Sequence, residues 1–437
     1  MIRFSLSSSA RPVPVEYRSN FIHLYLDIAW FGILSGSSMA FVAVYAARQG
    51  ASAFQIGLLS AGPAIVNLMS ALPAARWLKK QPIGPAVFWA SVLHRVFYLP
   101  WLALPILLSP QGQIWTLIGL ILLMSIPGIA LGIGFNALFA DVVPTDWRGH
   151  VAGVRNGLLA ITFIVTSLAC GYILNHFPFP ANYQTVFGIG FLGAAMSSLH
   201  LWFVRPCLGE PVPTRVGRSL GDLARPGMIR TIGDGLRASV GLRFLSRDSG
   251  QRLLRTDILD GPFGRIAAVL FAFHLSQYLA IPLFPLYMVN RLHLSDQAIG
   301  LGSALFYVSV FLASTQLAYL TRQTSNQRVL AMGAAVMTSY PALIALSRGL
   351  GLFMVASLMG GLGWALASGA LNNYILDKVP HDDRPAHLAW YNLALNAAIL
   401  IGSLVGSFVG SELGLSFALS LSAACRLVAA LLIWRWG

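Results

Sequence analysis

Twelve stretches of about 20 predominantly apolar residues limit the fold of this chain more than any other feature. At a rise of 1.5 Å per residue, each stretch is long enough to cross a bilayer as one α-helix. The apolar residues lie on all sides of these helices and do not alternate, which excludes the short strands of a membrane barrel. The sequence therefore predicts an all-α membrane protein with two groups of six helices, over residues 20–46, 54–76, 84–108, 113–140, 150–174, 181–204, and then 265–290, 296–320, 328–347, 350–376, 386–410 and 413–435.

The composition excludes several classes of protein. Only 10% of the residues are charged and 56% are hydrophobic, whereas about 25% of a soluble chain is charged. A cytosolic enzyme, a secreted disulfide scaffold and a disordered tail are therefore excluded. The three cysteines have no metal-ligand spacing, and no Walker, H-E-x-x-H or G-x-S-x-G motif occurs. We expect no enzyme activity, no metal and no cofactor.

Basic residues gather on one side of the predicted helices. Of the 29 Lys and Arg residues, 24 lie in the segments on the side of the termini, and only Arg48, Arg291 and Arg348 lie in the opposite loops. This bias predicts a cell membrane protein, in a plasma or bacterial inner membrane, with both termini in the cytoplasm. The net charge of +14 thus reflects topology and does not predict nucleic-acid binding.

The domain organisation follows from the gap between the two groups of helices. We predict a cytoplasmic tail (1–19), a first six-helix bundle (20–205), a basic cytoplasmic linker (206–263) and a second bundle (264–437). Within the linker, apolar residues recur at helical spacing, which favours an amphipathic helix on the inner leaflet: Ile232, Leu236, Val240 and Phe244. A regulatory or partner-binding role for the linker is the alternative.

The two groups of helices are repeats of each other. The segment after helix four, NALFADVVPTDWRGHVAGVRN (136–156), aligns with NNYILDKVPHDDRPAHLAWYN (372–392) after helix ten, with seven identities in 21 positions. Repeated halves around a central site are typical of secondary transporters. The repeated residues are candidates for a cytoplasmic gate whose charged contacts break and reform as the halves move, although a plain helix-turn-helix corner is the alternative: Asp141, Pro144, Arg148, Asp377, Pro380 and Arg384.

Six plus six helices, a long basic central loop and D-x-V-P-x-x-x-R segments after helices four and ten resemble the major facilitator superfamily. The resemblance covers essentially the whole chain. It implies two six-helix bundles related by a pseudo-twofold axis along the membrane normal, which open a central cavity alternately to each side. It also implies that helices one, four, seven and ten line this cavity. The loop between helices two and three, PAARWLKK (73–80), departs from the family motif because it lacks the aspartate.

Three charged residues lie well within the predicted membrane spans. An ionisable group there must be paired, hydrated or neutral, so each is a candidate functional residue. Asp27 is the only acid well inside a helix and is a candidate proton carrier; a permanent pair with a cation is the alternative. Arg95, in helix three, is the nearest buried cation for such a pair. Arg426, in the last helix, is a weak candidate because that helix is expected to be peripheral.

Further polar and aromatic residues fall at mid-membrane depth. On helix seven, His274 and Gln277 are candidates for substrate binding, and Trp364 lies in a glycine-rich stretch of helix ten. Asn67 and Asn396 lie on helices two and eleven. Interhelical hydrogen bonding is the alternative role for the His and Asn side chains.

The sequence thus predicts a secondary active transporter of a small molecule. A mostly apolar cavity with few polar groups favours an amphipathic or cationic solute and proton-coupled efflux. The alternative is a transport-inactive scaffold or assembly factor of the same fold, which the altered loop motif favours. The expected partners are a small-molecule substrate and the lipid bilayer, and we expect a monomer.

Overall fold

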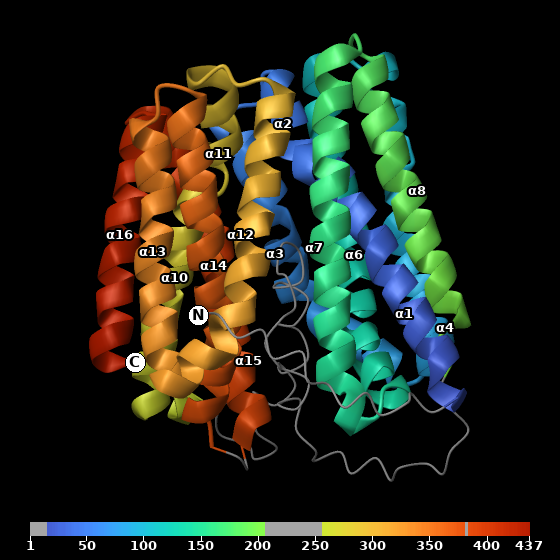
Figure 1. The fold of residues 1–437 in the computed structure, drawn as a ribbon, viewed down its shortest axis with the longest axis vertical. Coiled ribbons are helices and arrows are strands. Elements are labelled where there is room, and N and C mark those ends of the chain that lie inside the picture. Colours follow the sequence, from blue (N-terminus) through green and yellow to red (C-terminus); the bar gives the residue numbers. More distant parts are fainter. Residues whose placement is uncertain (1–14, 206–255, 381–382) are drawn as a thin grey trace, which may run out of the picture.

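The computed structural model describes residues 15–205, 256–380 and 383–437. The linker prediction for 206–255 and the predicted tail up to residue 14 lie outside the described residues. Eleven helices in the described part are long and apolar enough to cross a membrane. The twelfth crossing, predicted at 84–108, is a broken helix. The structure thus has the predicted all-α fold of two six-helix bundles (Figure 1).

The first bundle contains the elements α1 (Val15–Leu34), a π-helix (Ser35–Met39), α2 (Ala40–Arg48), α3 (Ala53–Leu78), α4 (Ile83–Arg95), α5 (Leu104–Leu107), α6 (Pro110–Val142), α7 (Thr145–His176) and α8 (Ala181–Phe203). The second bundle contains α10 (Pro262–Ala280), α11 (Leu283–Leu286), a second π-helix (Tyr287–Arg291), α12 (Asp296–Gln323), α13 (Asn326–Leu346), α14 (Leu350–Lys378), α15 (Arg384–Glu412) and α16 (Leu415–Trp436). Short 3₁₀ segments cover Val96–Tyr98, Pro100–Leu102 and Thr256–Ile258.

The third crossing is not the continuous helix that its apolar sequence predicts. Regular α-helix ends at Arg95 and gives way to 3₁₀ turns and the short α5. Pro100 and Pro105 lie in this stretch, and a proline has no N–H to donate within a helix. The break therefore follows from proline chemistry, which hydropathy alone does not register.

An even number of crossings brings the two ends of the described chain to one face of the bundle, which we call the terminal face; the other is the far face. At the terminal face, Asn20 Nδ2 donates to the Arg205 carbonyl (2.8 Å) and Lys378 Nζ to that of Gly437 (3.2 Å). The corners after α6 and α14 lie on this same face, as their repeated sequences predict. The terminal face is at the bottom of Figure 1.

The two bundles meet along two pairs of helices. The α7 helix packs against α12, and α3 packs against α15; the boundary between α7 and α12 is visible in Figure 1. In the far half, a single buried cluster draws on both bundles and joins Val44, Ile56 and Ile118 to Leu283 and Leu286. In the terminal half, the buried clusters at Leu138 and at Leu371 each belong to one bundle, apart from Ala64. Among the described residues, the apolar core is thus shared mainly in the far half.

Candidate functional site

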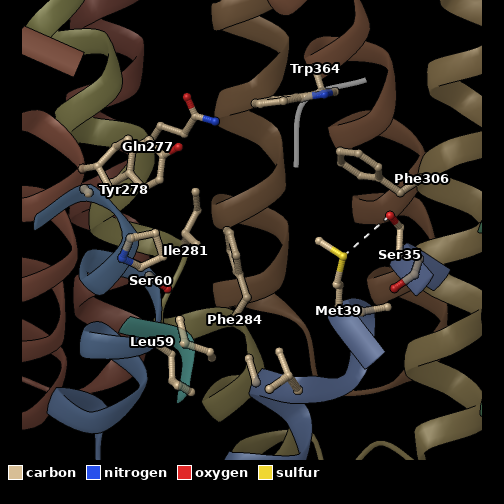
Figure 2. Close-up of a pocket in the computed structure, with 18 of the residues that line it drawn as sticks. Ser35, Met39, Leu59, Ser60, Gln277, Tyr278, Ile281, Phe284, Phe306 and Trp364 are labelled. Carbon is tan, nitrogen blue, oxygen red and sulfur yellow. Dashed lines mark hydrogen bonds between the residues drawn. The ribbon is translucent and has the colours of Figure 1, made fainter. Parts of the chain in front are cut away.

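A cavity of about 570 Å³ lies between the two bundles. Helices from both halves line it, including the π-helix after α1, α3, α6, α10, α12 and α14. Figure 2 shows Gln277 and Tyr278 on one side of this space and Ser35 and Phe306 on the other, with Trp364 projecting across it. Small-molecule sites in proteins commonly have volumes of about 300–1,000 Å³, so the cavity has the size of a site for a small molecule.

The wall of the cavity is predominantly apolar and aromatic. The aromatic residues come from both bundles: Tyr98, Trp101, Phe163, Tyr278, Phe284, Phe306, Tyr307, Tyr340, Phe353 and Trp364. The described lining residues include no Asp or Glu, and Arg426 is their one side chain with a formal charge. A wall of this kind suits an amphipathic molecule with few polar groups.

A π-helical turn forms part of the wall. Ser35 and Met39 begin and end this turn between α1 and α2, both line the cavity, and Ser35 Oγ contacts Met39 Sδ at 3.7 Å (Figure 2). A single π-turn inserts an extra residue into a helix and is frequent at functional sites. The irregular turn thus lies where the first helix faces the cavity.

Three of the predicted substrate candidates line the cavity: Asn67, Gln277 and Trp364. Asn67 also joins the bundles, because its Nδ2 donates to Oδ1 of Asn396 on α15 (3.0 Å). Asn396 Nδ2 in turn donates to the Asn392 carbonyl (2.9 Å). The structure therefore brings the two asparagines together across the interface between the bundles.

His274 does not lie among the residues that line the cavity. Its side chain is 3% exposed, and Nε2 lies 3.0 Å from the hydroxyl of Tyr391 on α15. This contact joins α10 to α15, and such interhelical hydrogen bonding is the role that the sequence analysis gave as the alternative to substrate binding by His274.

Asp27 is enclosed by two arginines inside the first bundle and does not line the cavity. Both Nη atoms of Arg155 lie 3.1 Å from Asp27 Oδ2, and Arg95 Nη2 lies 3.9 Å from Oδ1. Ser197 Oγ also donates to Oδ1 (2.5 Å). All three charged side chains are at least 94% buried. We call this group the Asp27 cluster, in which two guanidinium groups surround one carboxylate.

The sequence placed Arg95 near Asp27 but missed Arg155. Arg155 was counted with the basic residues of the cytoplasmic segments, whereas the structure places it well inside α7. Its guanidinium also donates to the Leu24 carbonyl and lies 4.8 Å from the centre of the Phe135 ring. Only the packing of α7 on α1 reveals this pair, since the two residues are 128 positions apart.

The predicted gate residues lie at the terminal face. Pro144 precedes the first turn of α7, and Arg148 donates to the carbonyls of Ala140 (2.7 Å) and Val143 (3.0 Å) in its own corner. Asp141 is exposed. In the second bundle Asp377 accepts from Asn326 Nδ2 (2.7 Å), Pro380 is exposed, and Arg384 begins α15. The bonds described here for Arg148 and Asp377 stay within one bundle.

An ion pair at the far face links the bundles, and the sequence did not predict it. Arg48, at the end of α2, lies 3.0 Å from Asp296 Oδ1 at the start of α12, and donates to the Leu294 carbonyl (2.5 Å). Tyr183 of α8 donates to the other carboxylate oxygen of Asp296 (3.1 Å). We call Arg48, Tyr183 and Asp296 the far-face lock.

Close helix contacts accompany the far-face lock. On α12, Gly300 lies against α7, where Ser167 Oγ donates to the Gly300 carbonyl (3.0 Å). A Cβ atom at position 300 would lie 2.8 Å from the Ser167 carbonyl oxygen and 3.3 Å from Cα of Gly171. Nearer the middle, the rings of Phe163 and Tyr307 are 3.8 Å apart. The far half of the interface is therefore tightly packed.

Comparison with known proteins agrees with this architecture. The sequence model of the Major Facilitator Superfamily matches residues 266–437, the second bundle. No curated protein matches the chain by sequence.

Solved transporters have a similar fold over the whole chain. A bacterial homologue of the iron transporter ferroportin in its inward-facing state superposes with a TM-score of 0.66 at 15% identity, covering 96% of this chain and 98% of that one. Its outward-facing state gives 0.57 at 15% identity, covering 96% and 99%. The nucleoside transporter NupG gives 0.62 at 12% identity, covering 97% and 99%. The chain therefore matches the family's sequence model in its second bundle and has the fold of these solved transporters along its whole length.

Proposed function

We propose that this protein is a secondary transporter that carries a small amphipathic molecule by alternating access. The observation that carries the proposal is the cavity between the bundles, whose surroundings differ at the two faces. At the far face the bundles share a buried cluster and the far-face lock. Towards the terminal face, each bundle has its own buried cluster.

This asymmetry is what one state of an alternating-access cycle requires. The higher TM-score to the inward-facing ferroportin homologue, 0.66 against 0.57, supports the same assignment. If the positive-inside bias holds and the terminal face is cytoplasmic, this is the inward-facing state. In the opposite state the far-face lock would break and the repeated corners with Arg148 and Arg384 would meet.

The lining residues support an amphipathic solute and do not support the cationic one that the sequence favoured. The described wall contains no acid to bind a cation, and its one formal charge is itself positive. The Asp27 cluster supports a structural role for Asp27 over a proton-carrying one, because protonation would leave two buried arginines without a counterion. The proposal therefore involves no proton transfer at Asp27.

Paired spin labels on α7 and α12 test the proposal. Thr145 and Gln323 are at the terminal ends of these helices and Asn175 and Gln297 near the far ends. In protein reconstituted into liposomes, we expect double electron–electron resonance to show two distances for each pair. Conditions that shorten the terminal distance should lengthen the far one.

A second result would contradict the proposal. If each pair shows one distance that stays the same in every lipid and at every pH tested, the result would favour the transport-inactive scaffold. Labels at Thr145 and Asn175, both on α7 and about 45 Å apart along the helix, provide the matched control, since no rocking of the bundles changes a distance within one helix.

A further inference from the structure

Arg426 is a buried cation in the wall of the cavity. It lies on α16, is 2% exposed and borders the cavity. Its Nη1 donates to the Met337 carbonyl on α13 (3.0 Å) and its Nη2 makes a long contact to the Gln277 carbonyl on α10 (3.4 Å). Its Nε has no hydrogen-bond partner among the described residues. Two backbone carbonyls thus hold the side chain, but part of its donor capacity is unused.

No described acid neutralises Arg426. The other two deeply buried arginines, Arg95 and Arg155, share Asp27 as their counterion. Arg426 forms no ion pair with a described acidic residue, and none borders the cavity. An uncompensated charge in a low-dielectric interior costs several kcal/mol, so a ligand that supplies the missing negative charge would bind favourably.

The surroundings of Arg426 suit the remainder of such a ligand. The Gln277 side-chain amide forms no hydrogen bond with the described residues and lines the same cavity. Figure 2 shows this amide and the Trp364 ring facing a common space, with Phe284 and Phe306 further along it. A charged end at Arg426 and an apolar end among the aromatic rings would therefore both be accommodated.

We propose that Arg426 and Gln277 bind the carboxylate of an amphipathic organic anion, whose apolar part packs against Trp364 and the neighbouring rings. The planar guanidinium matches a carboxylate because its parallel N–H groups point at both oxygens. This assignment rests on the proposed transport function and names the class of its substrate. It differs from the sequence-based expectation, which favoured a cation and set Arg426 aside.

Ligands that share a carbon skeleton and differ only in the charge of their polar group test the assignment. We would titrate purified protein in nanodiscs with phenylbutyrate, indolepropionate and naphthylacetate, and with the amide and amine of each, by isothermal titration calorimetry. The carboxylates should bind about tenfold more tightly than their amides, since only the carboxylate supplies the negative charge that the buried guanidinium lacks. The amines should bind most weakly.

Two substitutions locate the effect. R426Q should abolish the preference for carboxylate over amide, and R426K should retain part of the preference. R435Q, at an exposed position in the last turn of α16 and outside the cavity wall, is the matched control and should leave the preference intact. Equal binding of carboxylates and amides by the unsubstituted protein, or an undiminished preference in R426Q, would overturn the assignment.

The two proposals fail separately. Movement of the spin-label pairs without any preference for carboxylates removes the anion site and leaves the transport proposal standing. Carboxylate binding at Arg426 in a protein whose bundles never move supports the site and removes the transport proposal.

Discussion

The Asp27 cluster shows how strongly one buried acid depends on its partners. We expect D27N to lower the free energy of unfolding by about 3–5 kcal/mol, because it leaves two buried guanidinium groups without a counterion. Thermal unfolding in detergent, followed by tryptophan fluorescence, measures this change. D146N, at an exposed position in the first turn of α7, is the control and should have little effect.

The opposite result would change the role of Asp27. If D27N unfolds at the same temperature as the unsubstituted protein, the carboxylate is not needed to balance the two arginines, and the proton-carrier hypothesis from the sequence regains its support.

For single residues, the sequence predicted how deep a charged side chain lies in the membrane but not which other side chains it contacts. Counting residues from the start of the first helix placed Asp27 inside the membrane and pointed to Arg95, which the structure places 3.9 Å away. The sequence missed Arg155 and set Arg426 aside because the role of each depends on the direction that its side chain takes within the bundle. A residue's depth follows from its position along a helix, whereas its partner follows only from the packing of helices.

At the scale of elements, the contact between α7 and α12 should control the closure of the far face. We expect G300V to force the two helices apart, because its Cβ would meet the Ser167 carbonyl oxygen at 2.8 Å. The spin-label pair Asn175 and Gln297 should then report a longer distance. G157A on α7 is the matched control, since its Cβ would meet only the Phe311 ring, at 3.9 Å; an unchanged far distance in G300V would show that the interface adapts without opening.

The sequence predicted the number and order of the helices but not their irregularities. Hydropathy marks where a helix crosses the membrane, and it placed a crossing at 84–108 without showing that regular helix stops at Arg95. The two π-turns, at Ser35–Met39 and Tyr287–Arg291, likewise leave no mark in an apolar stretch. These local departures depend on which backbone groups find partners in neighbouring helices.

For the whole molecule, the far-face lock should bias the balance between its two states. D296N removes the charge that Arg48 and Tyr183 both contact, so we expect the far spin-label distance to lengthen and the terminal distance to shorten. The charge exchange R48D with D296R should restore part of the original distribution. An unchanged distribution in D296N would mean that the apolar cluster alone keeps the far face closed.

The overall architecture could be predicted from the sequence because the two six-helix halves are sequence repeats of each other. The repeated corners at Asp141 and Asp377 predicted two equivalent halves, and both corners lie on the terminal face. The conformational state was not accessible, since both states of an alternating-access cycle satisfy the same hydropathy pattern. What distinguishes them is a small set of contacts such as that between Arg48 and Asp296, which are 248 residues apart.

A fixed guanidinium in the cavity wall has an electrical consequence for the cycle. With an anion at Arg426 the occupied site carries no net charge, whereas the empty site is positive. An electric field across the membrane does work of about 2.3 kcal/mol per 100 mV on a full charge that crosses it, and a proportionate fraction on one that moves part of the way. Voltage would therefore act chiefly on the conformational change that returns the empty protein to its starting state. The membrane potential would then control how soon the protein can bind its next substrate.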